Sequence, residues 1–399
     1  MRIGIDISQV VHGTGVSSYT SNLVENLSKI DKKNQYILFG ASLRSKSNFN
    51  PLKEKLKDHH NFQFKIVSVP PTILEPMWNV FRYPKLERFI GEVDIFHSSD
   101  WCEPPIKTQN TKKISTVHDM ISFLFEKSVH PKIIKAQKRR LALVKKEVDL
   151  IIADSQSTKE DIIKFLQINR QKIRVIPLAA SNIFKPQDES KVNEVIAKYK
   201  IKKPYILSVG TQEPRKNIQK LLDVFGKLIE TNPELRLVLT GKYGWGEGFH
   251  SPQNVIWTDF IPEEELPALY AGARVFVYPS LYEGFGLPVL EAMACGTPVI
   301  TSNNSSMAEI AKDAAILVDP RSEAQLAKAI ELVLSLNLEN YQKMVRAGFE
   351  RVRQYSWTKT AKETLKAYED LYKESTENSA GAKLFHPGGG NEATPAELS

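Results

Sequence analysis

The sequence predicts an α/β protein that is built from two doubly wound parallel sheets. Two observations favour this class. Short runs rich in Val, Ile, Leu and Phe alternate with helical patterns along the chain, and such continuous apolar runs are typical of strands buried in parallel sheets. The 399 residues also suffice for two cores of roughly 150–200 residues each. We therefore expect two Rossmann-like domains that face each other across a cleft.

The expected strands form two sets, and helical patterns follow most of them. The first set is Arg2–Ser8, Gln35–Gly40, Phe62–Val69, Asp94–Ser99, Lys113–Asp119, Leu150–Ser155 and Ile173–Leu178. The second set is Tyr205–Gly210, Arg236–Gly241, Asn254–Phe260, Val275–Ser280, Pro298–Ser302 and Ile316–Asp319. A polar segment with Pro186, Ser181–Ser190, separates the sets and is the best linker candidate. We expect one domain over residues 1–182 and a second over residues 183–355.

The composition limits the functions that the chain can have. Cys102 and Cys295 lie far apart and without metal-binding spacing, so no disulfide framework is expected and a reducing cytoplasm fits. The N-terminus lacks a signal-peptide pattern, and no run reaches the ~18 apolar residues of a spanning helix. We expect a cytoplasmic protein that is soluble or peripheral to a membrane.

The net charge of +8 is unevenly distributed. Residues 1–180 hold 29 Lys and Arg against 18 Asp and Glu, whereas the remainder holds 25 against 28. A basic half suggests a phosphate-bearing acceptor, a membrane surface or a nucleic acid. Seven cations fall in Lys132–Lys146, a helical pattern that favours either membrane contact or a solvated face. No nucleic-acid-binding motif is present, so we expect no nucleic-acid partner.

The stretch EGFGLPVLE, Glu283–Glu291, carries the strongest functional pattern. Gly284 and Gly286 follow a buried-strand pattern and let the backbone turn tightly beside a ligand. Pro288 suits the first turn of the next helix, whose free N–H groups and dipole would bind a phosphate. The two terminal glutamates could each accept hydrogen bonds from a sugar diol. The pattern predicts a nucleotide-sugar site, although an ordinary glycine turn would give the same local structure.

This nonapeptide resembles the E-x7-E signature of retaining glycosyltransferases of family 4, which have the GT-B fold. The resemblance implies that Glu283 lies at the donor sugar and that Glu291 binds the ribose. It implies that four consecutive residues bind the diphosphate: Gly284, Phe285, Gly286 and Leu287. It also implies that a last helix, residues 356–375, crosses back onto the N-terminal domain and that Trp357 marks this crossing. The polar residues 376–399 are expected to form a disordered tail.

Two further motifs match the same family. TVHD places His118 at a strand end, where it would contact the donor sugar, although a histidine there is otherwise more often structural. PRKN places Arg215 and Lys216 before a helix whose dipole they oppose, and a bound diphosphate would resolve that conflict. Many relatives carry Arg directly after the preceding strand. This chain has Thr211 there, so that phosphate contact is missing unless Arg215 replaces it.

Other loops of the expected cleft carry weaker patterns. HGTGVSSYT supplies Gly13 and Gly15 but lacks the third glycine of a dinucleotide fingerprint, so a plain turn is the alternative. By the resemblance, this loop lies near the donor phosphates and the acceptor. The loops at Gly241 and Ile261 would flank the nucleobase.

We therefore predict a GT-B retaining glycosyltransferase that moves a hexose from a nucleotide-diphosphate sugar to a glycan or lipid-linked acceptor of a cell-envelope polysaccharide. The catalytic candidates are His118, Glu283 and Lys216. Lys216, Arg215 and the turn's N–H groups would stabilise the leaving diphosphate, so no metal or other cofactor is expected. Mannose from GDP-mannose is the first choice, and UDP-sugars remain open. A GT-B nucleotide-sugar epimerase and a non-catalytic nucleotide-sugar-binding protein are the alternatives. Docking at the inner face of the plasma membrane fits the basic half.

Overall fold

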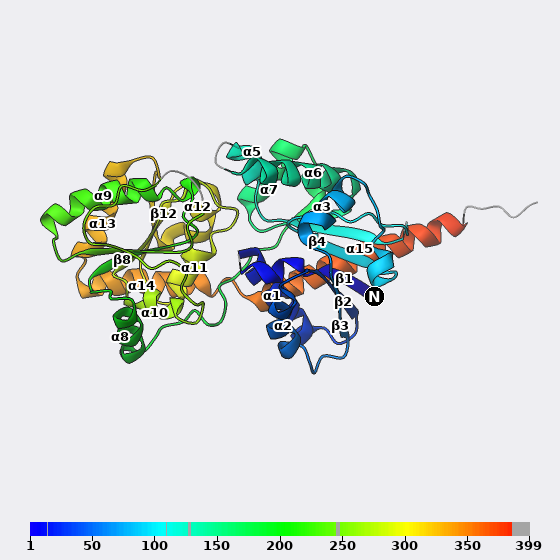
Figure 1. Cartoon of the computed structure of the whole chain (residues 1–399), viewed down its shortest axis with the longest axis horizontal. Helices are drawn as coiled ribbons and strands as arrows, with labels where there is room; N and C mark the ends of the chain where they lie inside the picture. The colour runs from blue at the N-terminus through cyan, green and yellow to red at the C-terminus, as the bar shows by residue number, and fades with distance from the viewer. Residues whose placement is uncertain (14, 109, 127–128, 245–247, 385–399) are drawn as a thin grey trace, which may run out of the picture.

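The computed structural model describes residues 1–13, 15–108, 110–126, 129–244 and 248–384 (Figure 1). The first half of the chain forms one α/β domain and most of the second half forms another, and the two domains lie side by side (Figure 1). The class that the sequence predicts, two parallel-sheet domains, is confirmed.

Each domain contains one parallel sheet. The first sheet contains β1 (Arg2–Asp6), β2 (Gln35–Ala41), β3 (Phe62–Val67), β4 (Ile95–Ser99), β5 (Lys112–Val117), β6 (Leu150–Ala153) and β7 (Ile173–Val175). The second contains β8 (Tyr205–Val209), β9 (Arg236–Thr240), β10 (Val255–Trp257), β11 (Val275–Tyr278), β12 (Val299–Ser302) and β13 (Ile316–Val318). Every predicted strand is present, with ends that differ by a few residues.

The strand order defines where a ligand can bind. The orders are β3-β2-β1-β4-β5-β6-β7 and β10-β9-β8-β11-β12-β13. In each sheet the chain first builds outward on one side of its first strand and then continues on the other side. This switch falls between β1 and β4 in one sheet and between β8 and β11 in the other. Ligands of doubly wound proteins bind outside the carboxyl ends of the strands at such switch points.

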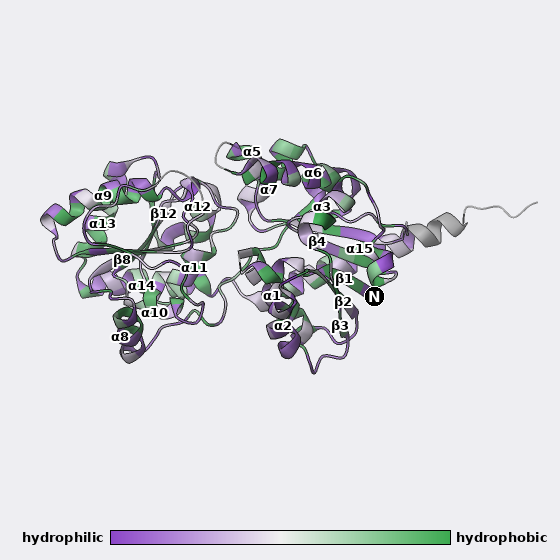
Figure 2. Ribbon diagram, in the orientation of Figure 1, coloured by the Kyte–Doolittle hydropathy of each residue, from purple (hydrophilic) through white to green (hydrophobic). Residues whose placement is uncertain are grey.

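Helices cover both sheets. In the first domain they are α1 (Gly15–Ile30), α2 (Asn50–Lys55), α3 (Pro71–Asn79), α4 (Glu87–Ile90), α5 (Ile121–Leu124), α6 (Pro131–Glu147) and α7 (Gln156–Leu166). In the second they are α8 (Glu189–Lys198), α9 (Ile218–Thr231), α10 (Leu266–Gly272), α11 (Leu287–Ala294), α12 (Ser305–Ala311), α13 (Glu323–Ser335) and α14 (Leu338–Val352). In α9, Leu221, Phe225 and Leu228 recur at helical spacing and are buried. Figure 2 shows the resulting mixture of hydrophobic and hydrophilic residues along such helices.

The last helix, α15 (Trp357–Leu384), returns to the first domain and packs against α1. Its Tyr368 hydroxyl lies 2.7 Å from Nδ1 of His97, and the Thr360 hydroxyl donates to the carbonyl oxygen of Pro177 at 2.7 Å. The crossing is therefore confirmed. The helix continues to Leu384 instead of ending at residue 375, so part of the tail that was expected to be disordered is helical. Residues 385–399 lie outside the described residues.

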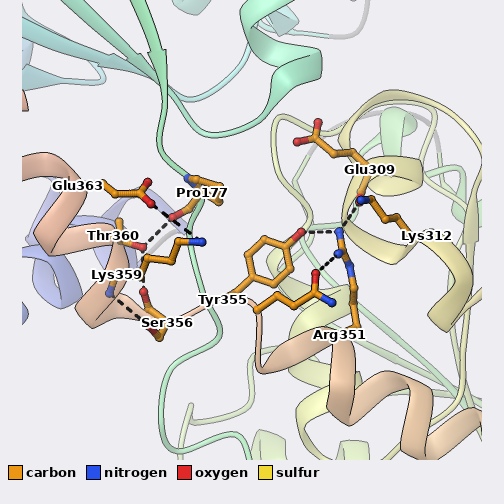
Figure 3. Close-up of a pocket in the computed structure, with 10 residues that line it drawn as sticks. Pro177, Glu309, Lys312, Arg351, Tyr355, Ser356, Lys359, Thr360 and Glu363 are labelled. Carbon is orange, nitrogen blue, oxygen red and sulfur yellow. Dashed lines mark hydrogen bonds and ion pairs between the residues drawn. The ribbon is translucent and has the colours of Figure 1, made fainter.

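A cavity of about 250 Å³ lies where the chain crosses between the domains (Figure 3). Arg351 of α14 lines it and donates to the carbonyl oxygens of Ile310 and Glu309, both at 2.6 Å. The same guanidinium reaches the Tyr355 hydroxyl at 2.6 Å. Because these donors already have protein partners, we assign this cavity to the joint between the domains.

Candidate active site

The loop between β11 and α11 forms the backbone of the site in the second domain. Gly286 caps α11 with a φ of 99°, a left-handed conformation that favours glycine. Pro288 lies in the first turn of α11, where its missing N–H costs nothing. Gly296, just past the helix end, has a φ of 82°. The strand, turn and helix that the sequence predicts are therefore confirmed.

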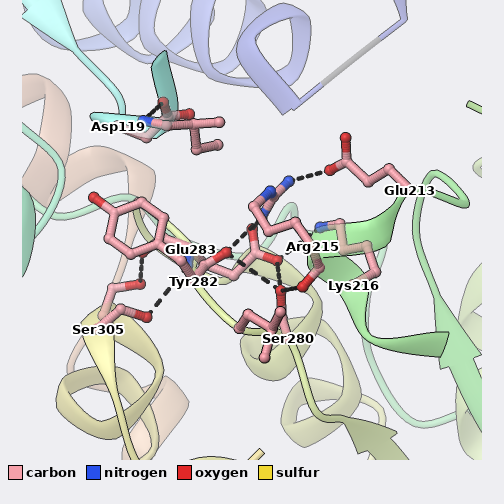
Figure 4. A network of polar contacts seen from close by, with 12 residues as sticks. Asp119, Glu213, Arg215, Lys216, Ser280, Tyr282, Glu283 and Ser305 are labelled. Atoms are coloured by element: carbon pink, nitrogen blue, oxygen red, sulfur yellow. Dashed lines mark hydrogen bonds and ion pairs between the residues drawn. The ribbon is translucent and has the colours of Figure 1, made fainter. Parts of the chain in front are cut away.

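Three charged side chains meet beside this loop (Figure 4). Oε1 of Glu283 lies 2.8 Å from Nζ of Lys216, and its Oε2 lies 2.8 Å from a guanidinium nitrogen of Arg215. Oε1 also accepts hydrogen bonds from the hydroxyls of Ser280 at 2.6 Å and Tyr278 at 2.9 Å. The cations come from the short 3-10 helix η5 (Pro214–Lys216), which follows β8. The cluster therefore spans the switch point between β8 and β11.

The charges of this cluster compensate each other in a buried environment. Burial alone would raise the pKa of Glu283, but the charges of Arg215 and Lys216 dominate and lower it to about 2. Burial lowers the pKa of Lys216, although the charge of Glu283 opposes this shift. Arg215 also pairs with Glu213 and donates to the Tyr282 carbonyl oxygen. Carboxylates of the protein itself thus offset the two cations that precede α9.

Glu291 lies in the second turn of α11. Its Oε2 accepts a hydrogen bond from the hydroxyl of Tyr270 at 2.9 Å. Burial raises the pKa of Glu291 to about 7, and the charge of Glu263 adds to the rise. Within the part of the chain that the structure describes, no Lys or Arg pairs with this carboxylate. Glu291 therefore changes its charge near neutral pH.

His118 follows β5 in the first domain. Its Nδ1 lies 2.7 Å from Oδ2 of Asp154, and Tyr19 packs edge-on against the imidazole with 4.8 Å between ring centroids. Burial lowers the pKa of His118, but the charge and hydrogen bond of Asp154 outweigh it and raise the pKa. Among the described residues, Nε2 has no hydrogen-bond partner although it is buried. This nitrogen is the ring atom that is free to meet a ligand.

The two halves of the site meet at Gly284. A Cβ on this residue would lie 1.9 Å from the carbonyl oxygen of His118, so only glycine permits the approach. The Gly284 carbonyl oxygen accepts hydrogen bonds from the hydroxyls of Ser155 at 2.7 Å and Thr158 at 3.0 Å. The structure thus brings His118 next to the loop that carries Glu283. The backbone of His118 makes the close approach that sequence reasoning assigned to a ligand.

Three more predicted donor-binding residues have structural roles as well. Phe285 is buried and packs edge-on against Tyr355. A Cβ on Gly241 would lie 2.1 Å from the carbonyl oxygen of Gly210, so the chain itself requires this glycine. The side chain of Ile261 belongs to the hydrophobic core. Any contact of these residues with a nucleotide would involve mainly their backbone atoms.

The remaining predicted residues lie at or near the ends of elements. Gly13 ends the 3-10 helix η1 (Ser8–His12) with a φ of 65°, and Gly15 begins α1. Residue 14 between them lies outside the described residues. Leu287 is the first residue of α11. Thr211 is exposed, and Arg215 turns instead towards Glu213 and Glu283.

The basic helix α6 does not present all its cations to solvent. Arg140 is buried and donates to the hydroxyl of Ser115 and the carbonyl oxygen of Thr116, both at 2.8 Å. Arg139 pairs with Glu75 at 2.8 Å. The expectation that this run forms one surface is therefore wrong for Arg140, because helix positions that face a sheet are buried whatever their charge. The exposed cations of α6 are Lys132, Lys135, Lys145 and Lys146.

Sequence reasoning missed the polar partners of the site. Asp154, which orients His118, follows β6, and Glu213 and Ser280 lie in the loops that follow β8 and β11. An acid at the carboxyl end of a parallel strand is a signal that could have found Asp154. Among the described residues, no group of three or more His, Cys, Asp or Glu is placed to hold a metal ion.

The two doubly wound domains place a glycine turn, a buried acid–cation cluster and an oriented histidine at the carboxyl ends of their strands, where α/β proteins of this class bind their ligands. Comparison with known proteins identifies the family. Residues 13–180 match the model for "Glycosyltransferase Family 4", and residues 191–351 match the model for "Glycosyl transferases group 1". The chain belongs to this family, and it is a glycosyltransferase that takes its sugar from a nucleotide sugar.

Individual relatives support this placement. O-antigen chain mannosyltransferase B of Escherichia coli is 34% identical over 278 residues, which are 65% of this chain and 71% of that protein. A serotype-specific mannosyltransferase of Escherichia coli is 28% identical over 288 residues, which are 68% of this chain and 35% of that protein. The structure of Anabaena HepE in complex with UDP and glucose has a TM-score of 0.69 at 16% identity, with 93% of this chain and 100% of that chain covered. That similarity shows the fold.

Proposed function

We propose that this glycosyltransferase moves mannose from GDP-mannose to a glycan acceptor of a cell-envelope polysaccharide and retains the anomeric configuration. The relatives named above are mannosyltransferases, and one is named for the O-antigen chain. The observation that carries the proposal is the buried cluster of Glu283, Arg215 and Lys216, whose loop meets the backbone of His118 of the other domain at Gly284.

The cluster can stabilise a leaving diphosphate. A diphosphate that binds at Arg215 and Lys216 would replace part of the compensation that Glu283 now supplies. The charge on its bridging oxygen grows as the anomeric bond breaks, so the two cations act most strongly in the transition state. The N–H groups at the start of α11 would add to this stabilisation. Glu283, relieved of part of its ion pairing, could then accept hydrogen bonds from hydroxyls of the donor sugar.

The remaining roles concern orientation. The carboxylate of Glu291 would accept hydrogen bonds from the ribose, and Nε2 of His118 would meet a hydroxyl of the donor sugar. With retention on one face, the leaving phosphate oxygen takes the proton of the acceptor hydroxyl. This chemistry needs no separate base residue, which distinguishes it from an epimerase with paired acid and base groups.

A donor panel tests the proposal. Purified protein is incubated with GDP-mannose, UDP-glucose or dTDP-glucose, and nucleoside-diphosphate release is followed with and without an oligomannoside acceptor. We expect acceptor-stimulated release from GDP-mannose, and the best ligand should raise stability by about 2.7 kcal/mol at 100 times its Kd. Preference for UDP-glucose would overturn the mannose assignment. Interconversion of the sugar without an acceptor would favour the epimerase, and nucleotide binding without turnover would favour a binding protein.

We further propose that the protein works in the cytoplasm at the inner membrane face. No described helix is long and apolar enough to cross a bilayer. However, the exposed Lys145 and Lys146 end α6, and Phe81, which is 75% exposed, neighbours Arg82, the ion-pair partner of Glu147 in α6. Exposed cations and an exposed aromatic ring on one domain suit an anionic lipid surface, where each cation contributes about 1 kcal/mol.

Liposome sedimentation tests the membrane proposal. Charge reversal of Lys145 and Lys146 should weaken binding to anionic liposomes at low salt, whereas reversal of the exposed Lys57, which pairs with Glu54 elsewhere on the domain, should change it less. If the wild type stays in the supernatant at low salt, α6 only presents a solvated face.

A further inference from the structure

Tyr19 of α1 is buried beside His118 and is not part of the donor site. The two rings pack edge to face, with 4.8 Å between their centroids and 75° between their planes, an arrangement that aromatic pairs prefer. Asp154 contacts only Nδ1 of the imidazole, and one hydrogen bond does not fix the tilt of its plane. The ring of Tyr19 restricts that tilt. It therefore bears on the direction of Nε2, which has no hydrogen-bond partner among the described residues.

A chain of buried hydrogen bonds anchors the hydroxyl of Tyr19. This hydroxyl lies 2.9 Å from Oγ1 of Thr116 in β5, and the same Oγ1 lies 2.7 Å from Nε2 of His97 in β4. Nδ1 of His97 lies 2.7 Å from the hydroxyl of Tyr368 in α15. All four side chains are buried. The chain therefore runs from the last helix through two neighbouring strands to the residue that packs on His118.

The groups of this chain are neutral. Burial lowers the pKa of His97 to about 3, and the charges of His118 and Arg140 add to the fall. Burial also raises the pKa values of the Tyr19 and Tyr368 hydroxyls above their ordinary range. A neutral imidazole has one N–H donor and one acceptor nitrogen, so His97 can accept from one neighbour while it donates to the other. The chain therefore fixes geometry and carries no charge.

Trp357, the first residue of α15, gives Tyr19 a second contact with this helix. The indole is buried, and its centroid lies 6.3 Å from that of the Tyr19 ring. Tyr355, two residues earlier, packs on Phe285 of the loop that precedes α11, with 6.0 Å between ring centroids. The segment that leads into α15 therefore contacts the donor loop on one side and the support of His118 on the other.

We propose that Tyr19 is a positioning residue for His118. The helix α15 holds Tyr19 in place, through Trp357 at the ring and through Tyr368 at the hydroxyl. An imidazole that tilts moves its Nε2 away from the sugar hydroxyl, and a misplacement of about 1 Å can cost about 10²-fold in rate. This inference rests on the role of His118 in the proposed function, which it deepens by naming the residues that orient the imidazole.

Steady-state kinetics with the donor that the panel selects separates the effect of the ring from that of its hydroxyl. We expect Tyr19→Leu to lower kcat about 10²-fold with little change in KM for the donor, because the diphosphate contacts lie in the other domain. Tyr19→Phe restores the ring, and it should lose only about fivefold, as for one hydrogen bond. Tyr368→Phe should lose about as much. Tyr372→Phe removes a hydroxyl one turn further along α15 and outside the chain, and it should leave kcat unchanged.

A double-mutant cycle tests whether Tyr368 acts through Tyr19. If the two hydroxyls belong to one chain, the double variant Tyr19→Phe/Tyr368→Phe should be no slower than Tyr19→Phe alone. Losses of kcat that multiply would show that Tyr368 acts by another route and would overturn the chain. This cycle does not use Tyr19→Leu, so it decides the question even if that variant does not fold.

NMR of histidines labelled with ¹³C at Cε1 gives a readout that does not depend on turnover. The protein has eight histidines, and His118→Gln assigns the signal of His118. In the free protein we expect Tyr19→Phe and Tyr368→Phe to shift this signal, whereas Tyr372→Phe should not. A signal that stays in place in the first two variants, or a kcat of folded Tyr19→Leu equal to that of the wild type, would overturn the inference. Shifted signals in a protein that transfers sugar from no donor would support the positioning of His118 and contradict the proposed function.

Discussion

The two switch points of this protein carry opposite chemistry. Between β8 and β11, Arg215 and Lys216 place two buried cations at the proposed diphosphate site. At the ends of β1 and β4, Asp6 and Asp100 place two acids, and burial raises the pKa of both, that of Asp6 to about 6. The net charge of each half of the chain has the opposite sign to that of its buried groups, since the first half is basic and the second is slightly acidic. Exposed side chains set the net charge, whereas a few buried groups set the chemistry of each site.

The two regions also differ in what offsets the cost of burying their charged groups. The cations of the second domain are paired with Glu283 and Glu213, so that site is a set of compensated charges. The acids of the first domain have no Lys or Arg within ion-pairing distance among the described residues, and their raised pKa values reduce the cost of burial. A compensated site suits an anionic donor that replaces one partner, whereas two buried acids without a cationic partner disfavour an anionic ligand.

The largest expected effect comes from removing the carboxylate that compensates Arg215 and Lys216. Glu283→Gln keeps the shape of the side chain but leaves Lys216 without a carboxylate and Arg215 with Glu213 alone. Removing one partner of a buried ion pair costs about 3–5 kcal/mol, so we expect a loss of about 3 kcal/mol in the free energy of unfolding at pH 7. Urea denaturation measures it. A nucleoside diphosphate should stabilise this variant more than it stabilises the wild type, because it replaces the missing charge.

The pH dependence of the same variant sharpens this test. The folded-state pKa of Glu283 is lowered from 4.5 to about 2, so its contribution is complete above pH 4.5 and is lost as the pH falls through about 2. The difference between the wild type and Glu283→Gln should therefore shrink on acidification. As a control, Glu160→Gln removes an exposed partner of Arg170 and should change stability little. Equal stability of both variants at pH 7 would contradict the compensated site.

The next effect concerns turnover. Lys216→Ala removes a cation whose attraction grows as charge develops on the leaving diphosphate. We expect kcat to fall by about 10²–10³, as for the loss of one oxyanion donor, while KM for the donor changes little. Lys220→Ala, in the first turn of α9 and paired with Glu323 at 3.2 Å, is the matched control. A raised KM with intact kcat would reduce Lys216 to a binding group.

The sequence predicts the fold well because its signals are local. Val275–Tyr278 is a continuous apolar run, and Gly286 and Pro288 mark the turn and the helix start. The compensation of Arg215 by Glu283 was not predictable, since it depends on β8 and β11 being neighbours in the second sheet. Arg140 shows the same limit, because the charge pattern of a helix does not reveal which side faces the sheet.

The small recess that Gln9 and Trp101 line could not be predicted for a related reason. These two residues are 92 positions apart in the sequence and meet only because β1 pairs with β4. The positive φ of Asp100 has no sequence signature of its own, since aspartate is only moderately favoured in that conformation. The order of the strands in the sheet decides these contacts. A single sequence predicts that order only by way of the fold class.

Glu291→Gln should have opposite effects on stability and on binding. The folded-state pKa of Glu291 is raised from 4.5 to about 7, so the wild type loses stability as the pH rises from 4.5 through about 7, and the neutral Gln does not. At pH 8 we expect the variant to be more stable by about 3 kcal/mol, with no difference at pH 4. Its affinity for GDP at pH 8 should fall by roughly 10–100-fold, because the ribose loses an ionised acceptor. Calorimetry that shows unchanged affinity would contradict the ribose assignment.

The smallest expected effect concerns His118, which lies between the two switch points. Gly284 of the donor loop packs on its backbone, the charge of Asp100 contributes to the rise of its pKa, and Asp154 lies 2.7 Å from its Nδ1. Asp154→Asn keeps an oxygen that accepts from Nδ1 but removes the charge that raises the pKa. Whichever protonation state of His118 the reaction uses, the limb of the kcat–pH profile that reports it should move to lower pH, with a loss of kcat of about tenfold or less at pH 7. In a His118→Gln background, Asp154→Asn should cause no further shift. If the limb stays in place when Asp154 is changed, the pair is only a packing contact.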